Sequence, residues 1–114
     1  MQNFSTEIVD DVLIEVVNLK RATSNEAPEF QKRLIKDIED GRRKIVVDLK
    51  NNVFMDSTFL GSLITTLKNI SKLGGDLRIA GTHGDTKAIF EFTGTSRVFK
   101  IFKNRGDAVK SYKK

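Results

Sequence analysis

The sequence predicts an α/β fold, in which helices cover a sheet with strands of mixed direction. Short apolar runs rich in β-branched residues alternate with longer segments whose apolar residues recur every three or four positions. Glycine or a short polar turn separates most of these segments. Two strands joined through a helix usually pair in parallel, so this alternation indicates a largely parallel sheet with helices on its faces.

A β-hairpin is predicted at the start of the chain. Residues 4 to 9 and 12 to 17 have the composition of strands, and Asp10-Asp11 between them is a turn signal. Residues 12 to 17 are mostly apolar and β-branched, which is typical of a buried strand. We therefore expect the second strand to lie inside the sheet.

A first helix is expected over residues 25 to 40. Asn25 is a favourable N-cap residue, Pro28 is tolerated in the first turn of a helix, and Gly41 ends it. One face of this helix is apolar, which indicates that it packs on the sheet. The residues of this face are Phe30, Leu34, Ile35 and Ile38.

The rest of the chain continues the alternation. A buried strand at residues 44 to 49 and the apolar run Val53-Phe54-Met55 precede the motif Asp56-Ser57-Thr58, where a second amphipathic helix begins. Gly74-Gly75 ends that helix. The remaining predicted elements are a strand at 76 to 80, a helix at 86 to 92, a strand at 98 to 102 and a helix at 107 to 114. The predicted order is ββαβαβαβα, with about five strands and about four helices.

The composition is that of one globular domain, residues 1 to 114. Hydrophobic residues make up 39% and charged residues 31%, and 114 residues are enough for a single packed core. The absence of cysteine excludes disulfides, thiolate nucleophiles and zinc–thiolate sites. Because the sequence has neither a signal peptide nor a long apolar run, we expect a cytoplasmic protein without a membrane span.

The end of the chain is strongly basic. Residues 95 to 114 hold seven Lys or Arg against one acid, Asp107, so this segment carries +6 and the rest of the chain −1, for a total of +5. Such a segment could meet nucleic acid, a membrane surface or an acidic partner, but a solvated helix face is the simpler interpretation. Phe99 and Phe102 are expected in the core and not as stacking platforms, so nucleic-acid binding is not expected.

The sequence does not indicate an enzyme. It contains no nucleophile elbow, Walker loop or dinucleotide fingerprint, and its one histidine, His83, lies in a glycine-flanked turn. No clustering of His and carboxylate residues predicts a metal site. Asp48 and Asp56 could pair as acid and base, but Asp48 is more simply a polar position in the sheet. We expect no cofactor.

The motif Asp56-Ser57-Thr58 has two interpretations. Asp, Ser and Thr are preferred N-cap residues, and a helix must begin here. A hydroxyl at a helix start after a strand also lies at the rim of the sheet, where backbone N–H groups and the helix dipole favour an added phosphate. A partner pressed against this rim would then meet a new negative charge beside Asp56. Composition and spacing alone favour the cap.

The segment from residue 44 to 81 resembles the STAS family, the domain of sulfate transporters and anti-sigma factor antagonists. In that family an apolar strand ending in Asp-Leu leads to Asp-Ser-Ser/Thr-Gly-Leu-Gly, then to a helix, Gly-Gly and a further strand. The matching residues here are 46 to 49, 55 to 61, 74 to 75 and 77 to 80, with weaker matches at 27 to 30, 89 to 94 and 98 to 102. The resemblance implies a STAS-like mixed sheet.

The resemblance also implies a binding protein controlled by phosphorylation. In single-domain bacterial members, an anti-sigma factor with serine kinase activity phosphorylates the serine that follows the motif aspartate. The unphosphorylated form binds this kinase and so releases a sigma factor, and a PP2C-type phosphatase restores binding after phosphorylation. Carried onto this chain, Asp56 is the motif aspartate, Ser57 is the phosphoacceptor, and Thr58 is a weaker candidate.

Phe59 departs from the family, which usually has glycine at this position. Its ring could pack inward or stand exposed as a partner anchor, and the sequence leaves both open. We expect the partner surface to combine the start of the second helix with the adjoining start of the first. Its residues are Asp56, Ser57, Thr58, Phe59, Ser24 and Asn25. The alternative function is a STAS subunit that does not switch, within a larger regulatory or transport assembly.

Overall fold

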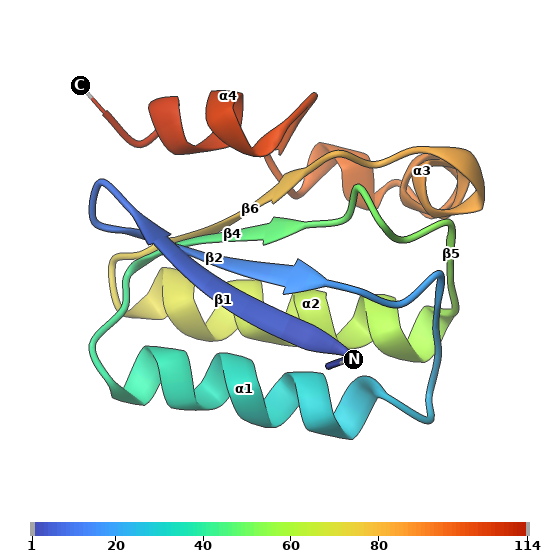
Figure 1. The fold of residues 1–114 in the computed structure, drawn as a ribbon, viewed down its shortest axis with the longest axis horizontal. Coiled ribbons are helices and arrows are strands. Elements are labelled where there is room, and N and C mark those ends of the chain that lie inside the picture. Colours follow the sequence, from blue (N-terminus) through green and yellow to red (C-terminus); the bar gives the residue numbers. More distant parts are fainter. Residues whose placement is uncertain (1, 114) are drawn as a thin grey trace.

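The protein has three layers, with a sheet between two pairs of helices (Figure 1). The structure is a computed structural model and describes residues 2 to 113. Helices α1 (Ala27–Glu39) and α2 (Ser57–Lys72) cover one face of the sheet. Helices α3 (Gly84–Phe92) and α4 (Arg105–Lys110) lie on the opposite side. The predicted α/β class and the order ββαβαβαβα are confirmed for these main elements.

The main sheet has five strands in the order β1-β2-β4-β6-β7. Strand β1 (Phe4–Val9) pairs with β2 (Val12–Val17) in antiparallel orientation. Strands β2, β4 (Lys44–Asp48), β6 (Asp76–Ala80) and β7 (Ile101–Phe102) then follow in parallel. A helix separates each of these parallel neighbours along the chain, as the sequence pattern predicts.

The hairpin turn consists of Asp10 and Asp11, which both have positive φ, at 49° and 69°. A two-residue turn with left-handed backbone at both positions matches the twist of the flanking strands. Asp tolerates this conformation better than most residues with a Cβ atom. The predicted turn is therefore confirmed, and it places β1 at the edge of the sheet.

A stack of three phenylalanine rings forms the centre of the core between the sheet and helices α1 and α2. Phe30 lies between Phe4 and Phe59, with ring centroids 4.6 Å and 5.1 Å away. All three side chains are buried. A smaller cluster on the other face of the sheet joins β2 to Ala108 and Val109 of α4. Burial of aromatic surface of this size dominates core energetics.

The N-terminus of α1 differs from the prediction, because Asn25 is not its cap. The helix begins at Ala27, and the side chain of Glu26 turns back to accept hydrogen bonds from the backbone N–H of Thr23 (2.9 Å) and its hydroxyl (3.1 Å). Thr23 and Glu26 have the spacing of a capping box, but the Thr23 hydroxyl accepts from the N–H of Asn25 (3.2 Å), and no side chain caps α1. Ile35 also departs from the prediction: it is 41% exposed.

The C-terminal elements are shorter than predicted. The strand predicted at 98 to 102 is only β7, because a 3-10 turn over Thr95–Arg97 precedes it and Phe99 packs edge-on against Phe90. Helix α4 starts earlier than residue 107, since the side chain of Asn104 caps it by accepting from the N–H of Asp107 (2.8 Å). Within residues 2 to 113, no helix is both long enough and apolar enough to span a membrane.

Candidate functional site

A second, two-stranded sheet carries the Asp56-Ser57-Thr58 motif to its position. Strand β3 (Arg21–Ala22) pairs in parallel with β5 (Phe54–Met55). Immediately after β5, the backbone N–H of Asp56 donates to the carbonyl of Ala22 at 3.0 Å. These bonds place the start of α2 beside the turn that leads into α1, at the end of the molecule where β5 is labelled in Figure 1.

The carboxylate of Asp56 joins the starts of the two helices. Its Oδ1 accepts a hydrogen bond from the N–H of Phe59 (2.9 Å), which makes Asp56 the N-cap of α2. Its Oδ2 accepts from the N–H of Ser24 (2.8 Å), in the turn before α1. The cap interpretation of the motif is therefore confirmed. The second bond follows only from the tertiary structure.

Ser57 and Thr58 are both exposed in the first turn of α2. Among residues 2 to 113, no side chain donates to or accepts from either hydroxyl. The first turn of α2 contains no acidic side chain after Asp56. The unpaired N–H groups of a first helical turn and the helix dipole stabilise negative charge. The hydroxyl of Ser57 thus lies where an attached phosphate is tolerated by the helix.

Phe59 packs inward, which decides between the two alternatives for its ring. The residue is fully buried, and the ring stacks on Phe30. The exposed partner anchor is therefore wrong for Phe59, because its ring is unavailable to a partner. The reason is tertiary: β1 and α1 provide two aromatic rings against which a third can stack.

Ser24 and Asn25 lie in the exposed turn that Asp56 holds. The N–H of Asn25 donates to the hydroxyl of Thr23 (3.2 Å), which leaves the Asn25 side chain on the surface. We call Ser24, Asn25, Ser57 and Thr58, with Asp56 between them, the DST surface. The structure thus brings together the predicted partner residues, except for the ring of Phe59.

Asn52 is a buried residue beneath the DST surface that the sequence analysis missed. Its Nδ2 donates to the carbonyls of Leu19 and Phe54, each at 2.9 Å, and its Oδ1 accepts from the hydroxyl of Thr86. Asn52 is 0% exposed and Thr86 is also buried. These bonds hold β5 against the chain before β3 and against α3. Two consecutive asparagines look like an ordinary turn in the sequence, so their different burial is not evident there.

Asp48 is a buried polar position of the sheet, as the sequence analysis favours. Its Oδ2 accepts from Nε of Arg105 at 2.8 Å, and the guanidinium also pairs with Glu7 at 2.6 Å. Burial acts to lower the pKa of Arg105, but these two carboxylates outweigh it and raise the pKa. The carboxylate of Asp48 thus bonds to Arg105, and that of Asp56 bonds to backbone N–H groups at the two helix starts. His83 lies at the start of α3, with Nε2 2.8 Å from the carbonyl of Lys50.

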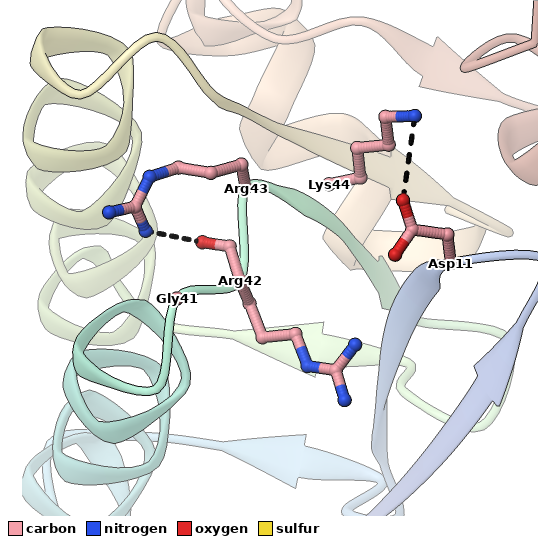
Figure 2. A pocket seen from close by; sticks show the side chains of 5 residues that line it. All are labelled: Asp11, Gly41, Arg42, Arg43 and Lys44. Carbon is pink, nitrogen blue, oxygen red and sulfur yellow. Dashed lines mark hydrogen bonds and ion pairs between the residues drawn. The ribbon is translucent and has the colours of Figure 1, made fainter.

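The described residues contain no cluster of metal-ligating side chains. In residues 2 to 113, no three His, Cys, Asp or Glu residues are grouped closely enough to hold a metal ion. A hollow of about 250 Å³ lies at the opposite end of the sheet, lined by Asp11, Gly41, Arg42, Arg43 and Lys44 (Figure 2). In it, Arg43 donates to the Arg42 carbonyl and Lys44 pairs with Asp11.

Comparison with known proteins agrees with this fold. The family model described as "STAS domain" matches residues 5 to 108. The chain belongs to the STAS domain family. Its relatives include the anti-sigma-B factor antagonist of Staphylococcus aureus, which is 35% identical over 82 residues. That alignment covers 72% of this STAS chain and 74% of the relative.

Two solved structures of other proteins have the same fold. A proposed anti-sigma factor antagonist from Thermotoga maritima has a TM-score of 0.91 and 28% identity, covering 97% of this chain and 95% of its own. The Bacillus protein SpoIIAA was solved in its phosphorylated form, with a TM-score of 0.74 and 14% identity, covering 95% of this chain and 97% of its own. At 14% identity, the similarity to SpoIIAA is evidence of a shared fold only.

Proposed function

We propose that this STAS protein is an anti-sigma factor antagonist whose binding is controlled by phosphorylation of Ser57. Its unphosphorylated form binds an anti-sigma factor with serine kinase activity in the cytoplasm, and a sigma factor is thereby released. A PP2C-type phosphatase reverses the modification. The observation that carries the proposal is the exposed hydroxyl of Ser57 at the start of α2, next to the Asp56 carboxylate that joins both helix starts.

A phosphate on Ser57 acts locally in this arrangement. The group adds a charge of roughly −1.5 to −2 and three acceptor oxygens. The fold keeps its cap, because Asp56 and not Ser57 accepts from the N–H of Phe59. A partner that covers the DST surface, in contrast, must meet this charge next to Asp56. Lost hydrogen bonds and charge repulsion at the interface then release the partner without a change of fold.

The inward position of Phe59 supports this mechanism. With the ring buried, the exposed residues in the first turn of α2 are the small Ser57 and Thr58, and Gly61 and Ser62 follow half-buried in the next turn. A protein partner can therefore approach the first turn as closely as it can when glycine replaces Phe59. The departure from the family pattern changes the core and leaves the surface small.

The proposal is tested by comparing partner capture by Ser57→Ala and Ser57→Asp in pull-downs from the native cell. We expect Ser57→Ala to retain the kinase and Ser57→Asp to retain at least about tenfold less, a difference of about 1.4 kcal/mol. Thr58→Ala and Thr58→Asp are the matched controls at the adjacent exposed hydroxyl. Intact-mass analysis of the protein from its own cells should show one added phosphoryl group on Ser57.

Equal capture by the two Ser57 variants would contradict the switch. Persistent absence of the phosphorylated species across growth states and stress would do the same. The protein would then be a STAS subunit that does not switch, within a larger regulatory or transport assembly. A difference seen only between the Thr58 variants would move the phosphoacceptor to Thr58.

A further inference from the structure

A buried ionic cluster joins α1 to the hairpin, away from the DST surface. Glu15 lies in the middle of β2 and is only 1% exposed. Its Oε1 accepts from Nε and Nη2 of Arg33, at 3.1 Å and 2.9 Å, and from the hydroxyl of Thr6 at 3.1 Å. These bonds join α1 and both strands of the hairpin through one carboxylate oxygen.

A second carboxyl group shares this cluster. Asp37 follows Arg33 by one turn of α1, so both side chains extend from the same face of the helix. Its Oδ2 is buried, and in the described part of the chain it has no donor to accept from. Asp37 lines the same hollow as Glu15, Arg33 and Thr6. When two carboxyl groups share a partly buried hollow, protonation of one removes the repulsion between them and supplies a donor for the other.

The charges around Asp37 favour the protonated form of its carboxyl group. From α1, Arg33 bonds to Glu15, whereas Lys36, which lines the same hollow, is 74% exposed and pairs with Asp40 at 3.4 Å. Asp40 adds a further negative charge, β2 contributes Glu15, and β1 contributes the uncharged Thr6. Burial and the neighbouring Glu15 raise the pKa of Asp37 from 3.8 to about 8, although Arg33 acts to lower it.

We propose that Asp37 and Glu15 share one proton at neutral pH, and that their hydrogen bond is a pH-sensitive latch between α1 and β2. The protonated Asp37 carboxyl donates to the Glu15 carboxylate, which completes the bonding of the otherwise unpaired Oδ2. Above about pH 8 a base in solution removes this proton. Two carboxylates then lie in one hollow, where Arg33 bonds to Glu15. Asp37 turns toward solvent, and the last turns of α1 lose this bond to β2, while Arg33 keeps its bonds to Glu15 and Thr6.

The decisive measurement is the titration of Asp37 in the full chain, followed by carbon-13 NMR of its side-chain carboxyl. We expect a midpoint near pH 8 in the unmodified protein. Glu15→Gln should lower this midpoint, because the amide carries no charge and can donate to the Asp37 carboxylate, while the burial of Asp37 remains. Asp40→Asn, at a partly exposed neighbour, is the matched control and should lower it much less.

A midpoint below about pH 5 for Asp37 in the unmodified protein would overturn the proposal, because a water and not a shared proton would then satisfy Oδ2. This measurement needs no variant, so misfolding of Glu15→Gln cannot leave the question open. Hydrogen exchange tests the latch itself. Amides in the last two turns of α1 should lose protection between pH 6.5 and pH 9 in the unmodified protein, after correction for intrinsic rates, and not in Asp37→Asn.

Equal loss of protection in both proteins would mean that Asp37 does not control α1. Neither experiment involves a binding partner or Ser57. Failure of the latch and failure of the proposed phosphorylation switch are therefore distinguishable.

Discussion

At the scale of single residues, Phe59 and Ser57 show how two residues of one helical turn can have different roles. Phe59 is fully buried in the phenylalanine stack, whereas Ser57, two positions earlier, is exposed at the same helix start. In a helix, two positions apart means roughly opposite faces. One turn of α2 can therefore contribute an aromatic ring to the core and present a small hydroxyl at the surface.

The burial of Phe59 predicts a large loss of stability on truncation. Phe59→Ala should lower the free energy of unfolding by about 3–5 kcal/mol, because it removes a ring and leaves a cavity beside Phe30. Phe92→Ala is the matched control, since Phe92 is 92% exposed, and it should change stability by about 0.5 kcal/mol or less. Urea unfolding of the two variants provides the measurement. Similar losses for both would place Phe59 outside the core.

At the scale of elements, the short strands β3 and β5 have an importance that their length does not suggest. Each has only two residues, yet together they bring the starts of α1 and α2 into contact through Asp56. The buried side chain of Asn52 also stabilises this pair of strands, through hydrogen bonds to the carbonyls of Leu19 and Phe54. Because a buried amide left without its partners costs about 1–3 kcal/mol, these bonds also specify how the loop is arranged.

The support from Asn52 can be tested at Thr86. Thr86→Val keeps the side-chain shape but leaves Oδ1 of Asn52 buried without its donor, which should cost about 1–3 kcal/mol. Thr66→Val is the matched control: Thr66 is equally buried, but its hydroxyl bonds only the carbonyl of Ser62 in its own helix. We expect a smaller loss there, of about 1 kcal/mol or less.

Hydrogen exchange at the backbone amides of Phe54 and Asp56 provides a second readout for this network. Thr86→Val should speed their exchange, and Thr66→Val should not. Equal stability losses together with unchanged exchange in both variants would show that the Asn52 network does not hold the DST surface in place.

At the scale of the whole molecule, the basic C-terminal segment is partly structural. Arg105 pairs with Glu7 in the first strand and with Asp48 in the middle of the sheet. Lys113 pairs with Asp10 at 3.0 Å. These bonds connect the end of the chain to its beginning on the α4 side of the sheet. The remaining cations between residues 97 and 110 are exposed, in agreement with the interpretation of a solvated face.

The shared proton has a consequence for the pH dependence of global stability. The folded protein holds a proton on Asp37 up to about pH 8, whereas the unfolded chain loses it near its ordinary pKa of 3.8. The folded state therefore binds more protons over this interval. The stability contributed by Asp37 is fully present below about pH 4 and is lost as the pH rises to about 8.

Urea unfolding between pH 4 and pH 9 measures this contribution. Subtracting the curve of Asp37→Asn from that of the unmodified protein should leave a difference that falls with rising pH and levels off above about pH 8. Asp40→Asn serves again as the control, because Asp40 is substantially exposed. A difference that does not vary with pH would mean that Asp37 titrates alike in both states.

Local sequence accounts for the element order and for half of the candidate site. The periods of apolar residues decide between helix and strand, and Asp56 caps α2 through a hydrogen bond that spans three residues. The turn before α1 is equally local, because Glu26 bonds back to Thr23, three residues earlier, but Asn25 is a more favourable cap residue by type. The last strand is shorter than the apolar run at 98 to 102 predicts. The run contains the strand residues Ile101 and Phe102 and also Phe99, which packs against Phe90 of α3, and apolarity alone does not separate these two uses.

The other half of the site depends on residues that are distant along the chain. The direction of the Phe59 ring depends on Phe4 and Phe30, the second bond of Asp56 depends on Ser24, and the proton of Asp37 depends on Glu15. Backbone dihedrals and caps act within one turn, so a linear pattern contains them. Burial, ring stacking and charge coupling depend on distances in space, and only the packing of helices on the sheet sets those distances.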